Sequence, residues 1–308
     1  MLILRVYKSF SFMPLAKNMF GEVILLIMTT MYSQAHTNLI FTKHDFPVNP
    51  LSKENYVLAL NDDFITKNID LKNWIPYYLP HWSSKEMTKP NYEIKAGNLT
   101  LKITEEQKPW CPEFNGEVKC SSIQTGLYSG KLGTAIGQHK VSPACIVREQ
   151  QKTTITFLQQ YGYFEIRAKA LYTKSNVVAL WMIGFEDSPE KSAEICIFEV
   201  KGSNVNKGKA TIGYGIRKFK DDKLTDDFHE DDFKIDVLKF HIYAAEWTPE
   251  KVIFYIDNQK TRELNQSPKY PMQFMLGIYE IPSEERDIKD ETYPKEFIVD
   301  YVRGYKRK

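Results

Sequence analysis

The sequence lacks a strong charge of either sign. Its 308 residues include 41 Lys and Arg against 39 Asp and Glu, which leaves a net charge of +2 at pH 7. Nucleic-acid-binding proteins usually carry a clustered basic surface, so this balance argues against a nucleic-acid partner. The locally acidic tract 221–236 is interpreted as a solvated loop rather than a binding tail.

The sequence also lacks a long apolar run. A membrane-spanning helix needs about 20 consecutive apolar residues, and the run Val23–Met28 is much shorter. Basic residues precede this run, and the segment Ser33-Gln34-Ala35 offers small residues at the positions that a signal peptidase favours. We expect a signal peptide or targeting segment at 1–35, no membrane span, and a secreted, periplasmic or cell-surface protein.

Cysteine is scarce, with four residues at Cys111, Cys120, Cys145 and Cys196. Their spacing does not match a zinc-binding array, and no His pairs accompany them. In an exported protein Cys111 and Cys120 could form a disulfide across a short polar loop. The sequence alone leaves the connectivity open.

Long helical periodicity and internal repeats are absent too, and short alternating segments take their place. Asn98–Ile103 alternates cleanly, and Val252–Ile256 and Phe297–Val302 are rich in β-branched and aromatic residues. Many short strands separated by turns are typical of a β-sandwich or barrel. We predict an all-β fold in one domain over residues 55–308, preceded by a linker at 36–54.

One predicted strand, Ser192–Gly202, contains two glutamates. On a regular strand alternate residues share a face, so Glu194 and Cys196 would lie together while Glu199 would point into the core. An unpaired carboxylate in the core is costly. A β-bulge between Ile197 and Glu199 would restore the parity and place both carboxylates on one surface.

Two carboxylates on one surface are what a retaining glycosidase needs. Such enzymes hold a nucleophile and an acid/base about 5–5.5 Å apart. On spacing alone, the alternative that both glutamates pair with lysines on a solvated face stays open.

The motifs around this strand resemble those of glycoside hydrolase family 16, the laminarinase, lichenase and agarase group. The family signature Glu-x-Asp-x-x-Glu corresponds to Glu194-Ile-Cys196-Ile-Phe-Glu199. Further segments in the same order resemble family strands over roughly residues 55 to 308: Tyr161–Lys169, Ala179–Gly184, Phe240–Trp247 and Phe297–Arg303.

The resemblance implies a jelly-roll β-sandwich, related to the lectin fold, whose concave sheet binds a polysaccharide. It makes Glu194 the nucleophile and Glu199 the acid/base, and it implies that Trp181 stacks on a sugar ring. Glu165 and Arg167 would contact sugar hydroxyls or orient the carboxylates, with a cross-strand salt bridge as the alternative. Of the other motif residues, Phe240, Tyr243 and Trp247 are assigned to the core and His241 has no assigned role.

Cys196 departs from the family pattern, because the signature has an aspartate there that is understood to tune the pair. A thiol is a weak donor and is neutral at its ordinary pKa. Losing a nearby negative charge should lower the pKa of both glutamates. The chain could work at more acidic pH, use another helper residue, or bind without hydrolysing; we expect it to be active.

The resemblance further predicts a retaining, endo-acting hydrolase of a β-linked polysaccharide. A β-1,3- or mixed-linkage glucan is favoured, followed by a galactan of the agar or carrageenan type. A carbohydrate-binding, lectin-like sandwich and a transglycosylase are the alternatives. No cofactor is expected, although this fold can hold a structural calcium ion, and a monomer is expected.

Overall fold

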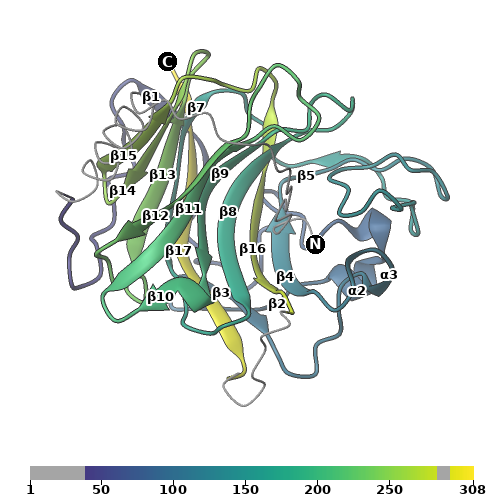
Figure 1. Ribbon diagram of the computed structural model, residues 1–308, viewed down its shortest axis with the longest axis horizontal. Coiled ribbons are helices and arrows are strands. Elements are labelled where there is room, and N and C mark those ends of the chain that lie inside the picture. The colour runs from purple at the N-terminus through teal and green to yellow at the C-terminus, as the bar shows by residue number, and fades with distance from the viewer. Residues whose placement is uncertain (1–38, 283–291) are drawn as a thin grey trace, which may run out of the picture.

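The computed structural model describes residues 39–282 and 292–308. It shows two antiparallel sheets packed face to face, with short helices and loops at one side (Figure 1). This is the all-β jelly-roll sandwich that the sequence predicts. The expected targeting segment at 1–35 lies outside the described residues. No helix in the described part of the chain is long and apolar enough to cross a membrane.

The eight-stranded sheet contains the first and last strands. Its order is β15-β14-β13-β7-β17-β3-β2, with β1 paired to β17. The bounds are β1 (Tyr56–Asp62), β2 (Asn91–Lys95), β3 (Asn98–Ile103), β7 (Gly162–Lys169), β13 (His241–Trp247), β14 (Val252–Ile256), β15 (Gln259–Leu264) and β17 (Lys295–Arg307).

The seven-stranded sheet is the layer that carries the two glutamates. Its order is β10-β11-β9-β8-β16-β4, with β12 paired to β11. The bounds are β4 (Lys119–Gln124), β8 (Asn176–Gly184), β9 (Glu194–Lys201), β10 (Val205–Asn206), β11 (Lys209–Arg217), β12 (Asp227–Phe233) and β16 (Met272–Glu280).

Short elements complete the described chain. A two-stranded sheet joins β5 to β6, and the helices α2 and α3 and two 3-10 helices lie in the connections. Their bounds are β5 (Gly126–Leu127), β6 (Thr154–Ile155), α2 (Lys85–Thr88), α3 (Pro112–Asn115), and the 3-10 helices Pro80–Trp82 and Gly202–Asn204.

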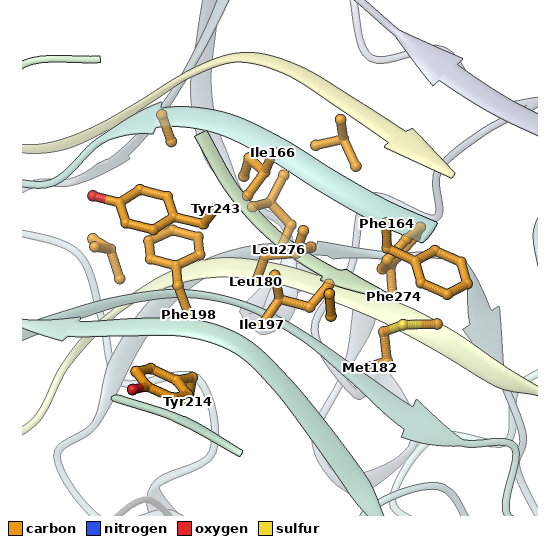
Figure 2. Close-up of a cluster of buried hydrophobic side chains, with 14 of the residues drawn as sticks. Phe164, Ile166, Leu180, Met182, Ile197, Phe198, Tyr214, Tyr243, Phe274 and Leu276 are labelled. Carbon is orange, nitrogen blue, oxygen red and sulfur yellow. The ribbon is translucent and has the colours of Figure 1, made fainter. Parts of the chain in front are cut away.

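The main core fills the space between the two sheets, because alternate residues of each strand point inward. Phe198 of β9 stacks on Tyr243 of β13 with ring centroids 4.3 Å apart. Phe164 of β7 meets Phe274 of β16 edge to face at 5.6 Å (Figure 2). Burying each such side chain stabilises the fold by about 1.5–3 kcal/mol. The sandwich is thus held together by side chains from both layers.

The other motif residues divide between the core and its rim. Tyr243 and Trp247 are buried in the main core, as predicted. Phe240 is buried too, but it lies outside that core, beneath the cations of Arg167 and Lys169. His241 is fully buried and pairs through Nδ1 with Asp257 Oδ2 at 2.7 Å, which is a structural role.

The segment before β1 and the four cysteines are arranged differently from what the sequence led us to expect. Residues 39–54, expected within a linker, lie against the eight-stranded sheet: Phe46 N donates to Phe240 O at 2.7 Å and Phe41 enters the main core. All four cysteines are buried free thiols, so the disulfide considered between Cys111 and Cys120 is not formed.

Candidate active site

The β-bulge that the sequence predicts is present in β9. Against β8, Phe198 pairs with Leu180 and Cys196 pairs with the next residue, Trp181, so Ile197 is the extra residue. Ile197 and Phe198 both point into the main core (Figure 2). The bulge therefore turns Glu199 to the same face of the sheet as Glu194.

Glycine in β11 allows the neighbouring strand to follow this bulge. Gly215 lies opposite Cys196, and the register of β11 against β9 shifts between Gly213 and Gly215. Gly215 has a φ of +140°, and a Cβ there would lie 2.3 Å from the carbonyl oxygen of Asp227. Residues with a side chain rarely adopt this conformation, so glycine is required beside the glutamates.

Both glutamates line a pocket on the outer face of the seven-stranded sheet. The pocket encloses about 170 Å³, and its walls are largely apolar and aromatic. Besides Glu194 and Glu199, the lining residues are Tyr78, Asn115, Val118, His139, Val141, Ala179, Trp181, Arg217, Tyr279, Ile281 and Pro282.

Arg217 connects the two carboxylates. It ends β11 and is the register partner of Glu194. Its Nε lies 3.6 Å from Glu194 Oε1, and its Nη2 lies 3.9 Å from Glu199 Oε2. One guanidinium thus bridges the pair. This answers the alternative left open by the sequence, because the glutamates pair with a pocket arginine and not with lysines on a solvated face.

The surroundings of the glutamates favour their protonated forms. Burial raises the pKa of Glu194 to about 7 and also raises the pKa of Glu199, while the charge of Arg217 opposes both shifts. Glu199 Oε1 is buried and accepts no hydrogen bond from the described residues. Near neutral pH the pair can therefore retain one proton, which belongs to the coupled pair and not to either glutamate alone. The reaction requires this proton on the acid, Glu199, with Glu194 ionised as the nucleophile.

Cys196 lies between the glutamates on the same face of β9. It is 1% exposed, and burial raises the pKa of its thiol well above the ordinary value, with further contributions from Glu194 and Glu199. The thiol is therefore neutral. The position that carries an aspartate in the family signature adds no charge to this site.

Trp181 of β8 lies in the pocket wall, and its stacking on a sugar ring stays a prediction. Its Nε1 donates to the hydroxyl of Tyr279 at 3.3 Å, and its ring lies 5.0 Å from that of His139. The indole is thus fixed at one edge. Burial lowers the pKa of His139 to about 3, so this neighbour is a neutral aromatic surface.

Most of the lining residues were not predicted from the sequence, among them Arg217, Asn115 and His139. Asn115 ends the four-residue helix α3, and its Oδ1 accepts a hydrogen bond from Trp110 Nε1 at 2.8 Å. Its Nδ2 is buried without a partner among the described residues. An unpaired amide donor in a pocket is suited to a sugar oxygen.

Glu165 and Arg167 are not brought to this pocket. They lie on β7, in the eight-stranded sheet, while the pocket lies on the seven-stranded sheet. Glu165 Oε1 lies 3.6 Å from the Arg303 guanidinium across the β7–β17 pair, and Arg167 pairs with Asp300 at 2.7 Å. The expected sugar contacts are corrected to cross-strand ion pairs, the alternative weighed from the sequence.

The site holds no preformed metal centre among residues 39–282 and 292–308. No group of three or more His, Cys, Asp or Glu side chains is placed there to bind a metal ion.

The sandwich and its bulged strand define a protein of the glycoside hydrolase class. The model of the family "Glycosyl hydrolases family 16" matches residues 83–293. The chain belongs to this family.

Among curated proteins, the chain is 26% identical over 160 residues to endo-1,3-1,4-beta-glycanase ExsH of Rhizobium meliloti, covering 50% of this chain and 32% of that protein. It is 24% identical over 169 residues to a beta-glucanase of Rhodothermus marinus, covering 47% and 57%. The chain thus spans about a third and just over half of these relatives.

A solved structure with higher identity is the GlcNAcα1-4Gal-releasing endo-β-galactosidase of Clostridium perfringens. It is 33% identical with a TM-score of 0.75, over 85% of this chain and 66% of that chain. A laminarinase of Flavobacterium sp. UMI-01 is 21% identical with a TM-score of 0.57, over 81% of this chain and all of that chain. The second likeness shows the fold.

Proposed function

We propose that this protein is a retaining, endo-acting glycoside hydrolase with Glu194 as nucleophile and Glu199 as acid/base. The observation that carries the proposal is the bulge at Ile197, which turns both carboxylates into one pocket beside a shared arginine. The assignment of the two roles rests on their positions in the family signature.

The proposed reaction has two steps. Glu194 attacks the anomeric carbon while Glu199 protonates the departing glycosidic oxygen, giving a covalent glycosyl ester. Water then attacks the same carbon, Glu199 takes its proton, and the bond to Glu194 breaks with overall retention. Trp181 and Asn115 line the same pocket and would provide an aromatic surface and an amide donor for the sugar.

For the substrate, we place a β-galactosidic bond ahead of the β-glucan that the sequence favoured. The support is the 33% identity to an endo-β-galactosidase over 85% of this chain. The curated glucanase relatives share 26% and 24% over half of the chain or less, so a glucan is the second candidate. In either case the substrate is a β-linked glycan cut inside the chain.

A polymer panel tests the proposal. Laminarin, lichenan, agar, carrageenan, xyloglucan and glycans ending in GlcNAcα1-4Gal are incubated with the protein, and new reducing ends are measured. We expect cleavage of one class, with the product first released as the β anomer, and loss of cleavage in Glu194→Gln. Binding without cleavage would instead indicate a lectin-like sandwich, and longer products would indicate a transglycosylase.

The leaving group separates the roles of the two glutamates. In Glu199→Gln we expect natural substrates to be cleaved about 10²–10⁴-fold more slowly, because acid catalysis is lost. Aryl glycosides with acidic phenols need little protonation, so their first step should be largely preserved. Glu194→Gln should lose both reactions. A reversed pattern would exchange the two roles.

A further inference from the structure

Arg217 lies at ion-pair distance from both glutamates and is not held in close contact with either one. Its distances to Glu194 and Glu199, 3.6 Å and 3.9 Å, are ion-pair distances that exceed a normal hydrogen bond. In the described chain, both glutamates make their ion pairs with this residue. A change in the charge of either carboxylate therefore changes its electrostatic interaction with the same cation.

The guanidinium is held in place by an aromatic ring. Its Cζ lies 3.5 Å from the ring centroid of Phe228, on β12. Gly213 makes room for that ring, because a Cβ there would lie 2.9 Å from Phe228 Cζ. Stacking on a ring is a favourable position for arginine, and it leaves the edge of the guanidinium facing the glutamates.

Other charges near the pair are balanced or more distant. Glu230 of β12 and Lys201 of β9 act on the site, but they pair with each other at 2.6 Å. Asp226, just before β12, repels a negative charge on Glu194 less than Glu199 does, and Cys196 is neutral. Arg217 is thus the charge that balances the pair.

We propose that Arg217 is the shared counter-ion of the two glutamates, balancing one negative charge that resides on Glu194 before glycosidic cleavage and on Glu199 after it. In the first step Glu194 forms a bond to the anomeric carbon, and Glu199 gives its proton to the leaving oxygen. The ester at Glu194 is neutral and Glu199 is the carboxylate. In the second step the proton of water passes to Glu199 and the charge returns to Glu194.

This assignment rests on the proposed function and gives a physical reason for tolerating Cys196. A buried carboxylate without a partner is costly. At each stage of the proposed reaction one of the two glutamates is a carboxylate and needs such a partner. Because the guanidinium of Arg217 lies near both glutamates, the negative charge can pass from one to the other and remain paired with the same cation. Arg217 is therefore a positioning residue that acts through the glutamates, and the neutral thiol between them adds no second negative charge.

The test measures the titration of both glutamates in Arg217→Gln and Arg217→Lys. The side-chain carboxyl carbons are followed by ¹³C NMR in glutamate-labelled protein, with Glu194→Gln and Glu199→Gln to assign the signals. In Arg217→Gln we expect both pKa values to rise by about 1–3 units, whereas Arg217→Lys should keep them near the wild-type values. Circular dichroism confirms that each variant is folded.

The pH profile of kcat/KM is the matching kinetic measurement. In Arg217→Gln the acidic limb of this profile should shift to higher pH by the same amount as the pKa values measured by NMR. In Arg217→Lys the limb should stay at its wild-type pH. A structural role alone would lower activity without moving the limb. Unchanged titration in Arg217→Gln, or equal shifts in both variants, would overturn the assignment. The titration needs no substrate, so an inactive wild type would count against the proposed function alone.

Discussion

At the scale of single residues, the site depends on how charge is arranged in a buried pocket. Glu194 and Glu199 are each less than a tenth exposed, and the buried neighbour between them, Cys196, is neutral. Removing an anion from this position lowers the pKa of the glutamates relative to a site that has an aspartate there. Burial acts in the opposite direction and raises both pKa values.

The substitution Cys196→Asp tests this balance. A carboxylate at this position would disfavour ionisation of both glutamates, so we expect both limbs of the pH–rate profile to move upward by about one unit. Activity should persist in both forms. Cys196→Ser is the control, because it changes the side chain without adding charge. An unshifted profile in Cys196→Asp would contradict this account of residue 196.

At the scale of elements, α3 extends the pocket beyond the sheet. Trp110 orients the amide of Asn115 and leaves the Nδ2 donor buried and unpaired. A sugar oxygen would satisfy this donor. Such a bond contributes about 0.5–1.5 kcal/mol, which is enough to matter for binding but not for the chemistry itself.

We therefore expect Asn115→Ala to raise KM about 2- to 10-fold with little change in kcat, as follows from a bond of that strength. The measurement is steady-state kinetics on the polymer that the panel identifies. Trp110→Phe is the matched control, because it keeps the amide and removes only its anchor, so its effect should be smaller. An Asn115→Ala variant with unchanged KM would remove this residue from the sugar site.

For strand β7 we expect substitutions to change stability and not catalysis. Glu165 is fully buried and contacts Asn49 Nδ2 at 2.9 Å as well as Arg303. Glu165→Gln should destabilise the fold by about 1–3 kcal/mol, because a buried ion pair is lost, while kcat and KM stay at wild-type values. Thermal unfolding and kinetics on the same preparations check this. Lost activity at full stability would restore the sugar-contact interpretation.

These elements show what the sequence could and could not predict. Parity along β9 was sufficient to predict the bulge, because a misplaced glutamate in the core would be costly. Alternation along β7 showed that Glu165 and Arg167 share a face, but not which sheet that strand joins. Arg217 was out of reach, because its contacts depend on the register of β11 against β9.

The two sheets together set a conflict between stability and function. The core between them is apolar and closely packed, whereas the pocket on the seven-stranded sheet buries two carboxyls and a guanidinium. Burying ionisable groups is costly. The rigid sandwich offsets this cost, and it fixes the glutamates in the geometry that the reaction requires.

Removing one carboxyl should therefore stabilise the molecule, but only above a certain pH. Glu194 has a folded pKa of about 7 against an ordinary value of 4.5. As pH rises, Glu194 loses its proton at a lower pH in the unfolded chain than in the folded protein. The free energy of unfolding therefore falls between pH 4.5 and pH 7. At 1.36 kcal/mol per unit the upper bound is about 3 kcal/mol. Glu194→Gln should thus gain stability over the wild type at pH 8.

Urea unfolding at pH 4.5 and pH 8 measures this difference. We expect the advantage of Glu194→Gln to be small at the lower pH and larger at the higher pH. The same advantage at both values would show that the substitution acts through packing and not through ionisation of Glu194.

The most direct test of the account is to trap the covalent intermediate on the intact protein. An activated 2-fluoro β-oligosaccharide of the class cleaved in the panel is added, and the labelled peptide is identified by mass spectrometry. We expect one glycosyl ester, on Glu194, and none in Glu194→Gln. A label on another residue, or a first product of inverted configuration from the active protein, would contradict it.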